Sequence, residues 1–196
     1  MRRAAPKAMA AGLLPLLVAG CHSVVVAEGV DDAPACVDPD MVVTSDLVGA
    51  LKSAPDGARL QVWHGQYGDI VIDKAVDLVG VTAEGVCVPV LGEGGPVFSS
   101  LHVTGNAEGA SIRGIGSTGT IQLASDVRLA RFHVRGATEA LVVDGPAQID
   151  QFLLTGNQTG LVVRADATVT NGLVVGNEGD GIRLKGPSTL GGRGAE

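Results

Sequence analysis

Four consecutive stretches of this chain repeat one pattern at a period of twenty residues. They begin at Leu101, Ile121, Leu141 and Leu161, and a fifth stretch of the same kind begins at Ile182. Each opens with an apolar-x-apolar triplet, turns at a pair of Gly, Asn, Asp or Pro residues, and then carries further short apolar runs. A fixed period of this size predicts a solenoid, because one coil cannot bury its own apolar side and must stack on a neighbour.

The repeat also predicts which residues point inward, because side chains alternate between the two faces of a strand. The first inward column contains Leu101/Val103, Ile121/Leu123, Leu141/Val143, Leu161/Val163 and Ile182/Leu184. The second contains Ile112, Leu129, Ile149, Val169 and Leu190, and the third contains Phe132/Val134, Phe152/Leu154 and either Leu173 or Val174. Intervening side chains are expected to face solvent. Asn157 and Asn177, at matching corners, are expected to tolerate left-handed geometry and to form a hydrogen-bonded ladder.

A short amphipathic helix is predicted over residues 45–54, before the repeat. Ser45 is a suitable N-cap, and Leu47, Leu51 and Ala54 share one face. A Pro-Asp-Gly turn then ends the helix. Because an open solenoid end exposes apolar side chains and unpaired strand edges, we expect this helix to cap the first coil.

Three motifs lie close together at the end of that helix and after it. They are Ala-Pro-Asp-Gly at 54–57, Gly-Gln-Tyr-Gly-Asp at 65–69 and Lys-Ala-Val-Asp-Leu-Val-Gly at 74–80. Together they resemble the opening of the right-handed parallel β-helix families, the pectin-lyase-like fold. The resemblance implies an all-β domain over residues 44–196, with about six coils of about 20 residues and a short N-terminal capping helix. The sequence ends at STLGGRGAE, part-way through a further coil, which favours a truncated member of a longer family; the alternatives are a frayed end or one covered by another chain. Residues 81–100 are expected to form a less regular coil.

Residues 1–20 have the pattern of a secretory signal, with a basic start followed by a short apolar run. The segment ending in Cys21 resembles the lipobox of bacterial lipoproteins, which implies a lipid-modified cysteine at the start of the mature chain. His22, rather than Asp, follows it, and by the same resemblance this favours the outer membrane. The alternative is ordinary signal cleavage near Ala19. Residues 21–43 are then expected to form a tether.

Two further cysteines, Cys36 and Cys87, remain if Cys21 is lipidated. In an oxidising envelope such a pair can form a disulfide. The alternative is two separate buried thiols, and the sequence does not decide between them.

Composition excludes some classes of function. The formal net charge of −7, with no basic stripe, argues against nucleic-acid binding. The four histidines are scattered and suggest no metal site, and no cofactor is predicted. Aromatic residues make up only 3% of the chain, so a carbohydrate platform could use only Trp63 and Tyr67, and Tyr67 is expected to pack against the first coil.

Four charged residues at outward positions are the candidate site. They are Asp144, Arg164, Arg183 and Lys185, on the face of the first strand of each coil, where a polysaccharide or protein ligand could bind. An acid beside a base could serve lyase or hydrolase chemistry. The alternative is a solvated charge ladder, because neighbouring coils are about 4.8 Å apart and Asp144 can pair with Arg164.

The leading hypothesis is a lipid-anchored envelope protein, or a secreted one, whose β-helix is a non-catalytic scaffold for structure or binding. The alternative is a degenerate or truncated polysaccharide lyase or hydrolase of the pectin-lyase-like fold. Gly-Ile-Arg-Leu-Lys at 181–185 resembles one element of the polygalacturonases, but their acidic elements are missing. Glu178 and Asp180 alone are too few for a calcium-dependent lyase. Ser99, Ser100 and His102 have no supporting order for a Ser-His-Asp site.

Overall fold

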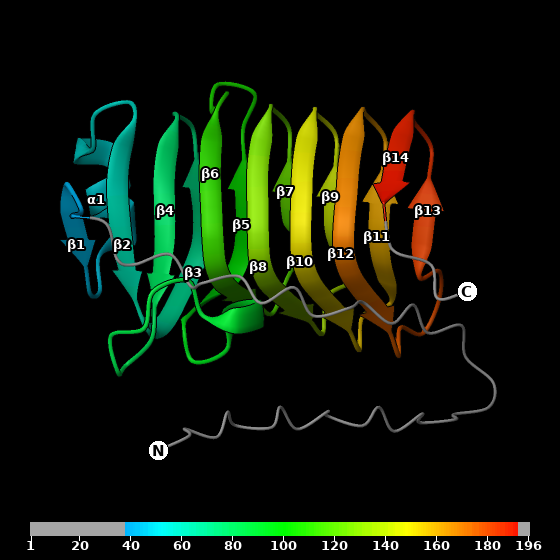
Figure 1. Cartoon of the computed structure of the whole chain (residues 1–196), viewed down its shortest axis with the longest axis horizontal. Helices are drawn as coiled ribbons and strands as arrows, with labels where there is room; N and C mark the ends of the chain where they lie inside the picture. The colour runs from blue at the N-terminus through cyan, green and yellow to red at the C-terminus, as the bar shows by residue number, and fades with distance from the viewer. Residues whose placement is uncertain (1–37, 192–196) are drawn as a thin grey trace, which may run out of the picture.

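The computed structural model describes residues 38–191, which form a parallel β-solenoid. Figure 1 shows its strands stacked side by side along one axis in two layers. The eight-strand stack contains β1 (Met41–Val43), β2 (Ala58–Trp63), β4 (Val76–Val81), β6 (Ala110–Ser117), β8 (Val127–Arg135), β10 (Ala147–Thr155), β12 (Ala167–Val175) and β14 (Ser188–Gly191). The six-strand stack contains β3 (Gly65–Ile72), β5 (Pro96–Val103), β7 (Ile121–Leu123), β9 (Glu139–Val143), β11 (Thr159–Val163) and β13 (Ile182–Leu184).

All strand pairs are parallel, which confirms the predicted all-β solenoid class. The solenoid has about eight coils rather than six, because the longer stack contains eight strands. Short strands at both ends account for much of the difference. β1 pairs with β2 although its residues fall within the predicted tether, so the solenoid begins at Met41 and not at residue 44.

Each long strand of the repeat bends once, and the bend explains why two inward columns lie on the same strand. Arg131, Gln151 and Asn171 have φ of 53°, 51° and 49° and are skipped in the strand pairing. Residues three apart, such as Leu129 and Phe132, would otherwise point to opposite faces of a strand. The left-handed residue between them restores the inward direction for both.

The predicted inward residues form one continuous core. Leu101, Ile121, Leu141 and Leu161 are at most 1% exposed, and Phe132 and Phe152 stack with ring centroids 5.5 Å apart. The third column continues at Val174, which packs against the core. In the last coils Ile182, Leu184 and Leu190 are in the predicted columns but about half exposed, at 45%, 47% and 47%.

The asparagine ladder is confirmed at one corner. Asn157 is 1% exposed; its Oδ1 accepts from the Ala137 N–H at 2.9 Å, and its Nδ2 donates to the Val134 carbonyl at 3.1 Å. Nδ2 also donates to Oδ1 of Asn177 at 3.0 Å. The left-handed conformation belongs to Gly156 and its equivalents one coil away, and not to the asparagines as expected.

Helix α1 (Leu47–Ser53) lies at the β1 end of the solenoid, as predicted for a cap (Figure 1). Leu47 and Leu51 are buried in the core. The N-cap is Asp46 and not Ser45, because the Asp46 carboxylate accepts from the Gly49 N–H at 2.8 Å. At the other end, the Lys74 ammonium donates to the Ala54 carbonyl at 3.0 Å, which satisfies part of the helix C-terminus.

The prediction of a less regular coil over residues 81–100 is wrong for most of that segment. β4 pairs directly with β6, so residues 82–95, which we call the strap, are not a layer of the stack. The strap contains a 3-10 turn, η1 (Val90–Gly92), and lies on the outside of β6 and β8. Val86 and Val90 of the strap are 51% and 71% exposed. Only Phe98, in β5, enters the main core.

Within residues 38–191, no helix is long and apolar enough to span a membrane.

Candidate functional site

A hydrogen-bonded network crosses four coils on the outer face of the six-strand stack. His102 Nδ1 and Gln122 Oε1 are 3.0 Å apart, and Gln122 Nε2 donates to Asp144 Oδ2 at 2.7 Å. Arg164 donates through Nη1 to Asp144 Oδ1 at 3.0 Å. The predicted pairing of Asp144 with Arg164 is therefore present, and both carboxylate oxygens of Asp144 have a donor.

Arg164 also reaches back across the face of the preceding coil. Its Nη2 lies 3.7 Å from Glu139 Oε2, while its Nη1 holds Asp144 in the same strand region. The guanidinium therefore lies within ion-pairing distance of carboxylates at both ends of β9. Val142 and Val162 occupy outward positions yet are 3% and 0% exposed, which contradicts the expectation that this column faces solvent.

The network sets the protonation of Asp144. Burial alone would raise the pKa of this carboxyl, but the hydrogen bonds from Gln122 and Arg164 and the charge of Arg164 outweigh it. The pKa of Asp144 is therefore lower than its ordinary value. A carboxylate held ionised in this way is a poor proton donor at neutral pH.

The other two candidate residues lie one coil further on and are not part of this network. Arg183 binds Asp180, three residues earlier, with Nε and Nη2 at 2.8 Å and 2.6 Å from Oδ2. Lys185 is exposed; its backbone N–H donates to the Val163 carbonyl, and its ammonium has no partner among the described residues. Of the four predicted residues, Asp144 and Arg164 thus pair with each other, Arg183 pairs with Asp180 instead, and Lys185 is solvated.

A polar groove of about 490 Å³ runs along the corner where the six-strand stack begins. Its walls come from four consecutive coils, and its members are Thr120, Thr138, Glu139, Gln158, Thr159, Gly179, Asp180 and Arg183. Hydroxyl, amide and charged groups alternate along it, and both carboxylates are paired with arginines. Of the predicted site residues only Arg183 lines this groove.

The other groove residues were missed by sequence reasoning, although a signal was present. Thr138, Gln158 and Gly179 succeed one another at the corner of successive coils, and Glu139, Thr159 and Asp180 do the same one residue later. These positions lie just before the apolar triplets, in the segments read as turns.

Other candidate residues are not brought together. Ser100 donates to Asp69 at 2.7 Å and Ser99 to the Tyr67 carbonyl, so neither is bonded to His102. Tyr67 is 7% exposed and packs edge-on against Phe98, as expected for a core residue. In residues 38–191 no group of three or more His, Cys, Asp or Glu side chains could hold a metal ion.

The predicted lipidation site Cys21 and the predicted disulfide partner Cys36 lie outside the described residues. Cys87 is 6% exposed and disulfide-bonded. The pairing of Cys36 with Cys87 stays a prediction.

Fold and surface together define the protein's class as a parallel β-solenoid with a polar groove on its outer face. Comparisons with protein-family models, curated proteins and solved structures found no match to this chain.

Proposed function

We propose that the protein is a non-catalytic binding scaffold of the bacterial cell envelope, anchored through a lipid at Cys21, whose groove holds a polysaccharide chain. The observation that carries the binding proposal is the continuity of the groove over four coils. Coils stack about 4.8 Å apart, so equivalent polar groups recur along its length at that interval. An elongated, hydroxylated ligand fits such a row of donors and acceptors.

The ion pairs support binding rather than turnover. Glycoside hydrolysis requires one carboxyl group that is protonated at working pH and a second that is ionised. Glu139 lies beside Arg164, and Asp180 accepts from Arg183, so both carboxylates in the groove already have an arginine partner. The lowered pKa of Asp144 makes this carboxyl of the adjoining network a poor proton donor.

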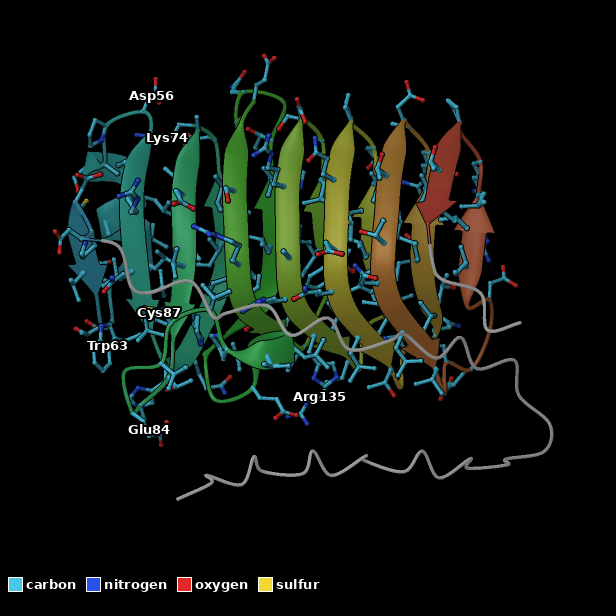
Figure 2. The ribbon with its side chains drawn as sticks, viewed as in Figure 1. Asp56, Trp63, Lys74, Glu84, Cys87 and Arg135 are labelled. Carbon is cyan, nitrogen blue, oxygen red and sulfur yellow. The ribbon has the colours of Figure 1, made fainter. Side chains whose placement is uncertain are left out.

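None of the described residues that line the groove is aromatic. Trp63 lies at the same edge of the solenoid (Figure 2) but at the end of β2, in an earlier coil than those that line the groove, and Tyr67 is in the core. Since aromatic stacking supplies much of the affinity in many sugar sites, binding here depends on hydrogen bonds and on contact with several sugar units. We therefore expect affinity to rise with the length of the oligosaccharide.

The binding experiment is a glycan array followed by calorimetry on the best oligosaccharide, with Gln158→Ala and Arg183→Ala as test variants. Matched controls are Gln148→Ala and Arg128→Ala, because both side chains are exposed on the eight-strand stack. The proposal predicts at least a fivefold loss of affinity in each test variant and no change in the controls. No binding by the wild type, or equal losses in tests and controls, would refute it.

The anchor has its own experiment. Metabolic labelling with a fatty acid should mark the wild type and leave Cys21→Ala unmarked. Equal labelling of both proteins, or labelling of neither, would refute lipidation at Cys21. Neither result would affect the proposal that the groove binds a polysaccharide.

A further inference from the structure

The strap crosses the outer surface of β6 and β8, and its close contacts there are made largely by backbone atoms. Gly114 has φ of 72°, and a Cβ there would lie 2.7 Å from the Val88 Cα and 2.7 Å from the Pro89 ring. Gly92 approaches the Ile115 carbonyl and the Gly116 amide so closely that a side chain would collide with them. The strap therefore fits only because glycines occur on both surfaces.

A small apolar cluster holds the first part of the strap, up to Val88. It consists of Val79 and Val81 from β4 with Cys87 and Val88 from the strap, and Trp63 packs against it. In Figure 2, Trp63, Glu84 and Cys87 lie at the same edge of the solenoid, while Arg135 projects further along it. Val88 thus connects the tryptophan cluster to the part of the strap that lies over β6 and β8.

His133 lies at the edge of residues 88–95 of the strap, and one of its ring nitrogens has no hydrogen-bond partner among the described residues. It faces outward from β8 beside Gly116, to which Gly92 is apposed. Its Nε2 is buried and has no hydrogen-bond partner among the described residues. The residues level with it in the neighbouring coils, Gly116 and Leu153, carry no charge.

Charged groups of β8 and of the strap surround this site. Arg135 and Glu93 act on the His133 ring, and Arg131, two residues earlier on β8, donates to the Val88 carbonyl of the strap at 3.5 Å. Arg135 lies two residues along β8, and Glu93 lies in the strap. Burial lowers the pKa of His133, Arg135 lowers it further, and the opposing effect of Glu93 does not compensate. Protonation of this ring is therefore disfavoured while the strap is bound to β6 and β8.

We propose that the strap is an acid-sensitive clamp: protonation of His133 releases residues 88–95 from β6 and β8 while the solenoid stays folded. The released histidine is solvated and binds a proton with its ordinary pKa of about 6.5. His133 binds that proton less well while the strap is bound to β6 and β8, so acidification below about pH 6.5 favours release. Release withdraws Val88 from Trp63 and exposes an apolar surface on β4. This inference is independent of the proposed function.

Trp63 is the only tryptophan of the chain, so acrylamide quenching of its fluorescence reports release directly. We expect the quenching constant of the full chain to rise at least twofold between pH 7.5 and pH 5.0, with unchanged far-ultraviolet circular dichroism. His133→Gln, which cannot titrate, should abolish the rise. His102→Gln should retain it, because that histidine is bonded to Gln122 on the other stack. His64→Gln, adjacent to Trp63, should also retain it.

A second measurement needs no variant. In a nuclear magnetic resonance titration, the amide signals of Gly92 and Gly95 should change with the same midpoint as the His133 ring. Different midpoints, no rise in quenching, a rise that persists in His133→Gln, or a simultaneous loss of circular dichroism would overturn the proposal.

Discussion

The asparagine ladder supports a quantitative prediction, because two equivalent side chains differ mainly in their access to water. Asn157 and Asn177 each take part in three side-chain hydrogen bonds at the same corner of successive coils. Asn157 is 1% exposed, whereas Asn177 is only partly buried. Truncation to Ala removes three bonds at either site, but water can replace them only at the second.

The expected loss for Asn157→Ala is about 4 kcal/mol of unfolding free energy. About 2 kcal/mol comes from the buried Ala137 N–H that loses its acceptor, and about 1 kcal/mol from each of the other two bonds. Asn177→Ala should cost about 1–2 kcal/mol, because Asn177 itself is partly exposed and water can enter the space that its side chain leaves.

The assay is urea unfolding followed both by far-ultraviolet circular dichroism and by Trp63 fluorescence. Coincident transitions are needed before a single free energy is quoted, because repeat arrays can lose two-state behaviour. The two variants should share one m-value. A difference below about 1 kcal/mol between them would refute the argument that burial sets the cost of the lost bonds.

Three further predictions follow from burial, capping and charge. Ile149→Ala, at 1% exposure, should cost about 2–4 kcal/mol in urea unfolding through the cavity it leaves, whereas Leu190→Ala, 47% exposed in the same column, should cost below about 1 kcal/mol. Asp46→Ala should lower thermal stability by about 1 kcal/mol while Ser45→Ala changes it by less than about 0.5 kcal/mol, and the reverse order would restore Ser45 as the cap. The pKa of Asp144 is lowered by folding, so its contribution is present above about pH 4 and is lost as pH falls through the folded value. Asp144→Asn should therefore flatten the decline of urea stability between about pH 4 and pH 2, and an unchanged acid slope would show that this carboxylate is not stabilised by its donors.

The repeat could be predicted because one physical constraint recurs in every coil. An apolar triplet at a period of twenty must face the stack, and Leu141 and Leu161 are fully buried as expected. The strap could not be predicted in the same way, because its valines imitate the spacing of a coil. The signal against a strand was the set of three glycines at 92, 94 and 95, which suits close backbone approach better than a strand.

The candidate site was predictable only where it depended on stacking. Asp144 and Arg164 occupy equivalent places in adjacent coils, so their pairing follows from the period. The pairing of Arg183 with Asp180 depends on a corner whose geometry the period does not specify. The burial of Val142, at 3% exposure, could not be predicted, because strand alternation alone places this side chain toward solvent.

The charge arrangement also limits what chemistry this face can support. Protonation of Asp144 would weaken its charge-assisted bond from Arg164 and its bond from Gln122, since both donors bind the ionised carboxylate. Glu139 and Asp180 each lie within ion-pairing distance of an arginine. An elongated ligand can instead add hydrogen bonds to the hydroxyl and amide groups of the groove while these ion pairs stay intact. The same ladder that stabilises the coils therefore favours binding over acid–base catalysis.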